Sequence, residues 1–144
     1  MGLGKKIKIL LIEDNPGDAY LIEDNLEEFA DFSYELKRVG TLNEGLNILK
    51  GQPFDVILLD IVLPDSDGVN TFFRIHNQNS CVPIILLIEL DDETIGSYAV
   101  EKGARDFFVK GQTESRLLEC IIQCSIEHKK RLSALFNGCS FLFG

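Results

Sequence analysis

The 144-residue sequence has no tryptophan, one methionine and four prolines, and it has no long hydrophobic run. Its first apolar segment, Ile7–Ile12, contains Lys8 and stops at Glu13 and Asp14. A membrane-spanning helix needs about 20 apolar residues, and a secretory signal needs an apolar stretch followed by a small-residue cleavage site. Because this segment has neither pattern, we interpret it as a buried strand and expect a cytoplasmic protein.

Basic residues are also scarce. There are 14 lysines and arginines against 23 aspartates and glutamates, which gives a formal net charge of −9. A chain this acidic has no overall attraction for nucleic acid or for an anionic membrane, so we expect neither as a partner. It could instead attract cations or a basic protein surface. The length fits one compact domain.

Cysteine and histidine are few, and they are not spaced as metal-binding knuckles. They are Cys81, Cys120, Cys124, Cys139, His76 and His128. Cys120 and Cys124 lie four apart on a predicted helix and could supply two ligands of a metal site. The interpretation we favour is buried free thiols in a reducing cytosol. We expect both histidines on solvated helix faces.

Five apolar runs alternate with amphipathic segments. The runs are Ile7–Ile12, Ser33–Val39, Phe54–Leu59, Ile84–Ile88 and Asp106–Val109. Three are almost continuous in isoleucine, leucine and valine, as expected of strands covered on both faces of a parallel sheet. The pattern predicts an α/β fold with a doubly wound, five-stranded parallel sheet, (βα)₅, in the order 2-1-3-4-5.

Helix starts are predicted from capping residues or from acidic residues in a first turn. They fall at Asn15–Pro16, Thr41, Asp67–Gly68, Asp91–Glu93 and Thr113–Glu114. The last helix can continue through Phe136, and Gly138 could end it. We place the main domain at residues 1–129 and treat residues 130–144 as a C-terminal helical extension or tail. Leu132, Leu135 and Phe136 could pack against a partner or a second copy, or the end could fray or mark the cut edge of a longer protein.

Charged residues collect where the predicted strands end. Glu13 and Asp14 follow the first strand, Asp60 ends the third and Lys110 follows the fifth. Ligands bind at the carboxyl ends of the strands in such sheets, so we expect three carboxylates and one ammonium in one cleft. An oxygen-only ligand set favours Mg²⁺ or Mn²⁺, and a carboxylate can act as a nucleophile towards phosphorus.

Four stretches in this order resemble the receiver domain of response regulators in two-component signalling. They are Ile9–Asn15, Pro53–Gly68, Val82–Leu87 and Gly103–Gln112. The resemblance implies a flavodoxin-like fold and a protein that is no enzyme beyond its own phosphorylation and dephosphorylation. It implies a histidine kinase or phosphotransfer protein as donor and a downstream protein as target. It also implies a possible homodimer through the fourth helix, fifth strand and fifth helix.

The resemblance assigns a role to each matching position. Asp60 is the implied phosphoacceptor, and Lys110 is implied to contact the phosphoryl group. The implied Mg²⁺ ligands are Glu13, Asp14, Asp60 and the backbone carbonyl of Val62. Phe107 takes the place of the aromatic switch residue, although ordinary core packing explains a phenylalanine there equally well. Pro64 and Gly68 are implied to shape the loop beside the acceptor.

Two positions depart from the family pattern at the end of the fourth strand. Ile88 stands where the family has a serine or threonine, and Glu89 stands where it has a small residue. The missing hydroxyl removes a bond to the phosphoryl group, at a cost on the order of 1.5–3 kcal/mol. Glu89 adds negative charge beside Asp60 or pairs with Lys110. We therefore expect weakened or rewired switching.

Other interpretations use the same residues. A degenerate receiver would act as a phosphorylation-independent interaction module, which Ile88 and Glu89 favour. A haloacid-dehalogenase-type phosphatase needs an acid two residues after its nucleophile, where this chain has Val62. Flavodoxin-type flavin binding needs an uncharged phosphate loop, and the loop after the first strand is acidic. We therefore disfavour both enzymes.

Overall fold

The computed structural model describes residues 5–111 and 116–136. Five strands form one sheet, in which all neighbouring strands are parallel and the order is β2-β1-β3-β6-β7. They are β1 (Ile7–Ile12), β2 (Tyr34–Val39), β3 (Val56–Asp60), β6 (Ile84–Ile88) and β7 (Asp106–Val109). Because β6 and β7 are the fourth and fifth strands of this sheet along the chain, the predicted order 2-1-3-4-5 is confirmed.

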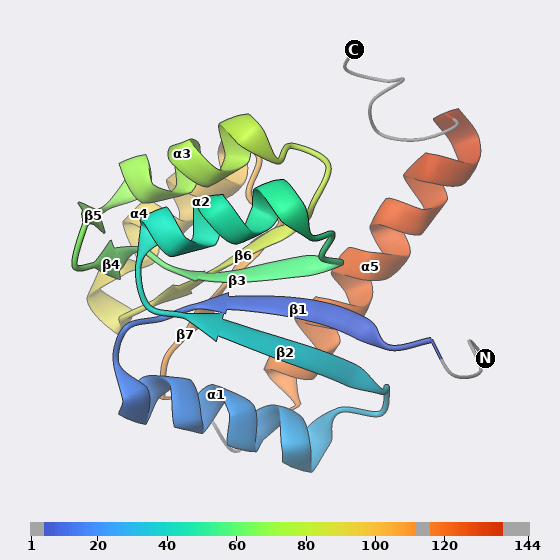
Figure 1. Ribbon diagram of the computed structural model, residues 1–144, viewed down its shortest axis with the longest axis horizontal. Coiled ribbons are helices and arrows are strands. Elements are labelled where there is room, and N and C mark those ends of the chain that lie inside the picture. The colour runs from blue at the N-terminus through green and yellow to red at the C-terminus, as the bar shows by residue number, and fades with distance from the viewer. Residues whose placement is uncertain (1–4, 112–115, 137–144) are drawn as a thin grey trace.

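Five α-helices cover the two faces of the sheet (Figure 1). They are α1 (Pro16–Phe29), α2 (Leu42–Gly51), α3 (Val69–Gln78), α4 (Glu93–Glu101) and α5 (Leu117–Phe136). The helices α1 and α5 pack on one face, and α2, α3 and α4 pack on the other. The doubly wound α/β fold is therefore confirmed. Within the described ranges, none of the helices is long and apolar enough to cross a membrane.

The first two helices begin where their capping residues predict. The side chain of Asn15 accepts the backbone N–H of Asp18 at 3.0 Å, and Pro16 occupies the first turn of α1. The Thr41 hydroxyl accepts the N–H of Glu44 at 3.1 Å at the start of α2. Each cap satisfies a backbone donor that the first turn of a helix leaves unpaired. These caps hold α1 and α2 directly beyond the carboxyl ends of β1 and β2.

A small hairpin, which the periodicity did not predict, follows β3. It pairs β4 (Val62–Leu63) with β5 (Ser66–Asp67) in antiparallel fashion. Gly68 then takes a φ of 77°, a left-handed conformation that favours glycine, and its N–H donates to the carbonyl of Ile61 at 2.8 Å. This turn leads directly into α3 and fixes the loop beside Asp60.

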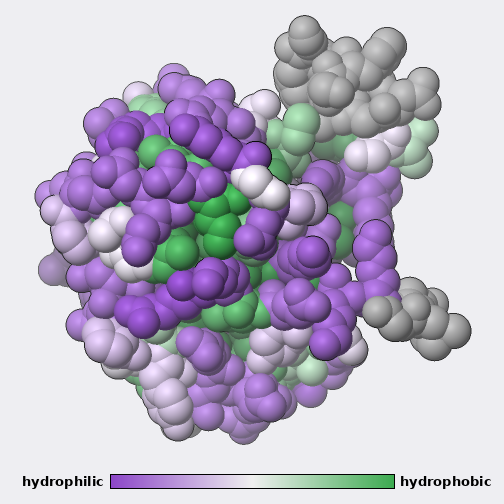
Figure 2. All heavy atoms as spheres, viewed as in Figure 1, coloured by the Kyte–Doolittle hydropathy of each residue, from purple (hydrophilic) through white to green (hydrophobic). Residues whose placement is uncertain are grey.

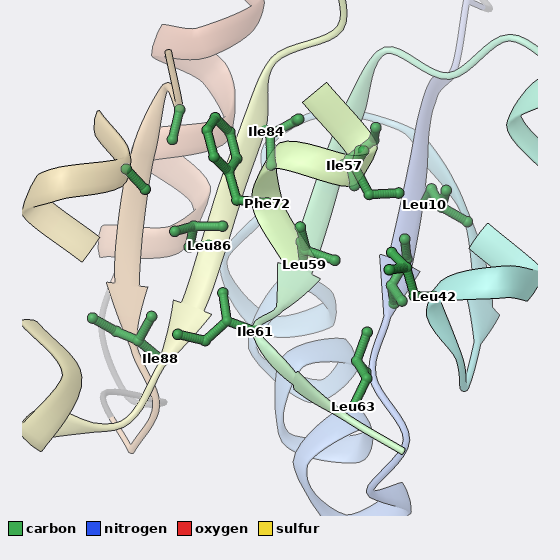
Figure 3. Close-up of a cluster of buried hydrophobic side chains, with 14 of the residues drawn as sticks. Leu10, Leu42, Ile57, Leu59, Ile61, Leu63, Phe72, Ile84, Leu86 and Ile88 are labelled. Atoms are coloured by element: carbon green, nitrogen blue, oxygen red, sulfur yellow. The ribbon is translucent and has the colours of Figure 1, made fainter. Parts of the chain in front are cut away.

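Two buried clusters, one on each face of the sheet, explain why the central strands are almost continuously apolar. In β3, Ile57 and Leu59 face the cluster under α2, α3 and α4, whereas Val56 and Leu58 face the cluster under α1 and α5. Figure 3 shows the first cluster, in which Ile88 at the end of β6 and Ile61 directly after β3 lie together. The core therefore extends to the edge of the sheet where the charged residues collect.

Polar residues cover most of the molecular face in Figure 2, and apolar atoms show mainly at its centre.

Two expectations about histidine and cysteine side chains are wrong. His76 is half-buried and stacks on Phe72 with ring centroids 5.0 Å apart, whereas His128 is exposed as expected. Cys120 and Cys124 are exposed, because the inner stripe of α5 is already filled by apolar residues and Ser125. Cys81 is partly buried, and Cys139 lies outside the described residues.

The helix α5 reaches Phe136 as predicted, and its C-terminal part projects away from the rest of the molecule (Figure 1). Its buried residues end at Ile126, and Leu135 is 74% exposed. The predicted start at Thr113–Glu114 and the predicted end at Gly138 lie outside the described residues. The domain boundary after residue 129 stays a prediction.

Candidate functional site

Three carboxylates meet at the carboxyl ends of β1 and β3. Glu13 and Asp14 directly follow β1, and Asp60 is the last residue of β3. One oxygen from each carboxylate lies within 4.8 Å of the others. Glu13 and Asp60 are buried, whereas Asp14 is exposed. The structure thus brings together the three acids that the strand order places side by side.

Lys110 follows β7 and reaches this cluster from the far side of β6. Its Nζ atom lies 2.7 Å from Oδ2 of Asp60, 2.8 Å from Oε1 of Glu13 and 2.9 Å from Oδ2 of Asp18. The lysine side chain is 12% exposed, so these bonds form largely out of water. Ion pairs that are shielded from solvent are stronger than the same pairs at a surface. Lys110 is therefore held by three carboxylates at once.

The charges in this cluster shift one another's proton affinities. Burial raises the pKa of Glu13 to about 7, and the adjacent Asp60 carboxylate adds to the rise while Lys110 opposes it. Burial alone would lower the pKa of Lys110, but its close contacts with the carboxylates of Asp60, Glu13 and Asp18 outweigh burial and raise that pKa. A buried carboxylate with a raised pKa gains from any additional positive charge placed beside it. The cluster thus has the electrostatics of a cation site.

Asp18 is a site residue that the sequence reasoning missed. It lies in the first turn of α1, one helical turn beyond the Glu13–Asp14 pair. The cap at Asn15 sets the start of the helix and so aims the Asp18 carboxylate back at Lys110. The sequence did predict a helix start at Pro16. An acid in the first turn of that helix must lie near the end of β1, so the position of Asp18 could have been inferred.

Arg38 is a second residue that the sequence reasoning missed. It lies on β2, and its guanidinium donates to the backbone carbonyls of Glu13 and Asp14, each at 3.0 Å. The N–H of Glu13 also donates to the carbonyl of Val39 at 3.0 Å. These bonds tie the acidic loop to the edge strand of the sheet.

An open cleft of about 440 Å³ surrounds the cluster. Besides the residues already placed there, its lining includes Val62, Pro64, Ile88, Glu89 and Asp92. The N–H of Val62 donates to Oδ1 of Asp60 at 2.9 Å, so this oxygen and Oδ2 each have a partner. The bond orients the Asp60 carboxylate at the floor of the cleft.

Ile88 lines this cleft but belongs to the core. It is 1% exposed and packs in the cluster of Figure 3, whereas Glu89 beside it is exposed. On α4, a Cβ built at Gly96 would lie 2.8 Å from the ring of Phe107 and 3.1 Å from Cδ1 of Ile88. The Phe107 ring and Ile88 therefore both pack on the backbone of α4 at Gly96. Because residue 88 is an isoleucine, it has no hydroxyl group to offer Asp60.

Comparison with known proteins identifies this arrangement. Residues 9–122 match the response regulator receiver domain family. This chain is a receiver domain. The match covers more than half of the chain and includes every charged residue of the cluster.

Two relatives show how the receiver domain occurs. Protein PilH of Pseudomonas aeruginosa is 27% identical over 116 residues, which cover 79% of this chain and 93% of PilH. The transcriptional regulatory protein CiaR of Streptococcus pneumoniae is 30% identical over 104 residues, which cover 72% of this chain and 45% of CiaR. The receiver therefore matches nearly all of one relative and about half of the other.

Solved receiver structures share the fold. A response regulator receiver domain from Clostridium thermocellum superposes with a TM-score of 0.75 at 24% identity, covering 88% of this chain and 98% of that one. The signal receiver domain of a histidine kinase from Syntrophus aciditrophicus gives a TM-score of 0.71 at 28% identity, covering 86% and 92%. Receiver domains of response regulators are signalling modules, and this family binds Mg²⁺ at an acidic pocket.

Proposed function

We propose that this receiver domain accepts a phosphoryl group on Asp60 from a histidine kinase or a phosphotransfer protein. The observation that carries the proposal is the joint contact of Asp60 with Lys110 and with two further carboxylates at one sheet edge. Lys110 supplies fixed positive charge where phosphoryl oxygens would arrive. Phosphoryl transfer needs mainly positioning and charge neutralisation, and both are available here.

The residues present fit a magnesium site. Glu13, Asp14, Asp60 and the backbone carbonyl of Val62 are the proposed ligands, and all four residues line the cleft. Carboxylate and carbonyl oxygens are the donors that Mg²⁺ and Mn²⁺ prefer. Such an ion, when bound, supplies positive charge to the phosphoryl oxygens. The raised pKa of Glu13 also fits, because a nearby cation would favour its ionised form.

The proposed step forms a bond between an oxygen of Asp60 and phosphorus as the bond from phosphorus to its donor breaks. The electron pair of the broken bond stays with the leaving group, which is the histidine ring of the partner or the remainder of a small-molecule phosphodonor. Lys110 moves one of its hydrogen bonds from a carboxylate to the new phosphoryl group. Asp60 is buried except at the cleft, so the donor must approach from that opening.

The response to phosphorylation is weakened in this proposal. Ile88 cannot donate a hydrogen bond, and its side chain is committed to the core beside Ile61. The end of β6 therefore has no polar side chain at position 88 with which to follow a phosphoryl oxygen. Glu89 adds negative charge beside the arriving anion. Both features reduce the free energy that phosphate can transmit to η1 (Leu90–Asp92) and α4.

Intact-mass spectrometry tests the proposal. The protein is incubated with Mg²⁺ and a small-molecule phosphodonor, alongside Asp60→Asn as the control. We expect wild type to gain the mass of one phosphoryl group and Asp60→Asn to gain none. An adduct that persists in Asp60→Asn would contradict the assignment of Asp60, and no adduct on wild type would contradict phosphorylation of this chain.

A second candidate function is a phosphorylation-independent interaction module on the same fold. It is favoured by Ile88 and Glu89, and by the fact that Lys110 is already paired with three carboxylates. The double variant Ile88→Thr/Glu89→Ala separates the two candidates. If only the double variant is labelled, the wild-type chain is a degenerate receiver.

The remaining assignments concern location and partners. We propose a cytoplasmic protein that contacts a downstream protein target and binds neither nucleic acid nor membrane. A homodimer through α4, β7 and α5 is also proposed, and Tyr98 and Val100 of α4 are exposed at 45% and 38%. Sedimentation with and without a phosphoryl mimic tests the dimer.

A further inference from the structure

We infer that Asp18 competes with the phosphoryl group for Lys110 and so sets how readily this receiver takes up phosphate. The inference rests on the proposed function of Asp60 and Lys110. It concerns an acid on α1 that lies outside the three-carboxylate group able to hold a metal. Asp18 would act as a built-in anion that occupies the lysine while phosphate is absent.

Three carboxylate oxygens crowd the ammonium group of Lys110. Its Nζ atom donates hydrogen bonds to Oδ2 of Asp18 at 2.9 Å and to Oδ2 of Asp60 at 2.7 Å, and Oε1 of Glu13 lies 2.8 Å away in an ion pair. A phosphoryl oxygen that binds Lys110 enters this crowded site and competes with the carboxylates for the same cation. Close binding of phosphate to Lys110 therefore weakens or replaces one of these contacts.

Exposure and chain position identify Asp18 as the contact that is replaced. Its side chain is 34% exposed, whereas those of Glu13 and Asp60 are 0% and 8% exposed. A partly hydrated carboxylate can return to water at little cost, but a buried one would be left without a partner. Glu13 and Asp60 are also proposed Mg²⁺ ligands, so moving either of them away would disrupt the metal site. Asp18 has no such second role.

The start of α1 holds Asp18 in this position. Its backbone N–H donates to the Asn15 side chain, so the cap fixes the first turn and the direction of the Asp18 side chain. The carboxylate then bridges 2.9 Å to Lys110, which follows β7 at the other side of the cleft. Displacing it frees the lysine without disturbing the sheet.

The test compares Asp18→Asn with Asp24→Asn. Asp24 is an exposed acid on the same helix, so the control removes the same charge away from Lys110. Beryllofluoride serves as the phosphoryl mimic, and its affinity is measured at saturating Mg²⁺ by fluorine NMR. We expect Asp18→Asn to bind it about three- to tenfold more tightly, since a charge-assisted bond to a partly exposed group is lost. Asp24→Asn should bind as wild type does.

Two further measurements separate competition from a structural effect. The Mg²⁺ affinity of Asp18→Asn should stay within about twofold of wild type, because Asp18 is outside the metal set. In metal-free protein, nitrogen-detected NMR should show faster hydrogen exchange at the Lys110 ammonium of Asp18→Asn than in wild type. Asp18→Glu, which keeps the charge, should restore slow exchange.

The outcomes are distinguishable from failure of the proposed function. Unchanged beryllofluoride affinity in Asp18→Asn, or an equal gain in Asp24→Asn, overturns the inference while the phosphoacceptor role stands. Unchanged ammonium exchange also overturns it. If no variant binds beryllofluoride although exchange at Lys110 rises, the Asp18–Lys110 contact is supported and the proposed function fails.

Discussion

Arg38 connects the edge strand β2 to the acidic loop that follows β1. Its guanidinium donates two bonds at 3.0 Å to the carbonyls of Glu13 and Asp14, so one cation restrains both carboxylates through their backbone. Arginine suits this task because its planar group presents several donors in fixed directions. Residues that orient metal ligands in this way affect affinity without touching the ion.

Replacing Arg38 by methionine should therefore weaken Mg²⁺ binding by about tenfold, as is typical when support of a metal ligand is removed. The matched control is Lys37→Met, which removes one positive charge from an exposed neighbour on the same strand. Isothermal titration with MgCl₂ gives both affinities. Equal losses in the two variants would show that Arg38 acts only through its charge.

His76 predicts a pH dependence of stability that is separate from the site. Burial lowers its pKa from the ordinary value of 6.5, and its ring is stacked on Phe72 near Gly103. The unfolded chain therefore binds a proton at a higher pH than the folded protein does. The free energy of unfolding should fall as the pH drops below about 6.5 and level off below the lowered pKa.

The variant His76→Phe keeps the stacked ring and removes the titrating group. Urea unfolding at about pH 7 and pH 5 should show a smaller loss of stability in this variant than in wild type. His128→Gln, at an exposed position, serves as the control and should behave as wild type. An unchanged pH slope in His76→Phe would assign the dependence to other groups.

The individual site residues differ in how far the sequence predicted them. Strand ends are marked by abrupt changes from apolar to charged residues, so Glu13, Asp60 and Lys110 could be placed at one edge from the strand order alone. Asp18 and Arg38 reach that edge through a helix turn and a long side chain. Their direction depends on tertiary packing, which periodicity does not encode.

At the scale of elements, α4 packs on β7 through a position without a side chain. Gly96 leaves room for the Phe107 ring, and a methyl group there would lie 2.8 Å from it. Ile88 at the end of β6 borders the same space at 3.1 Å. Ile88 and Phe107, the two apolar residues predicted as switch positions, thus pack on the same glycine of α4.

The substitution Gly96→Ala should force the Phe107 ring to move and should lower the free energy of unfolding by about 1–3 kcal/mol through overpacking. The better helix propensity of alanine offsets part of this cost, by up to about 1 kcal/mol. Gly51→Ala is the matched control, because nothing lies within 4 Å of a Cβ at that position. Urea unfolding and the aromatic NMR signals of Phe107 report the result. A stabilised Gly96→Ala would mean that the ring contact is loose.

The elements themselves were mostly predictable, and the misses are informative. Ile7–Ile12, Ile84–Ile88 and Asp106–Val109 match their predicted bounds because each run is closed by charged or polar residues. The third strand begins at Val56 rather than at Phe54. There the Asp55 carboxylate accepts the N–H of Lys8 at 2.8 Å, so side-chain bonding occupies the start of the run. The hairpin of β4 and β5 is too short to produce a periodic signal.

At the scale of the whole molecule, several of the acidic residues behind the net charge of −9 gather at one cleft. Glu13, Asp18 and Asp60 contact Lys110, and Asp14 lies beside Glu13 and Asp60. The cleft also takes in Glu89 and Asp92. This group has the chemistry of a cation site, at which we propose that the phosphoryl group is bound. Its link to α4 and β7 passes through Ile88, which is apolar and buried. We therefore predict that this receiver accepts a phosphoryl group on Asp60, and that phosphorylation changes the conformation of α4 and β7 only slightly.

The most direct test is an amide proton–nitrogen NMR spectrum recorded before and after phosphorylation with Mg²⁺ and a small-molecule donor. We predict shifts around Asp60 and Lys110, with small shifts in α4 and β7 of the wild-type protein. In Ile88→Thr/Glu89→Ala the shifts should spread through α4 and β7. Large shifts throughout α4 and β7 in wild type, or no shift at Asp60, would contradict the account.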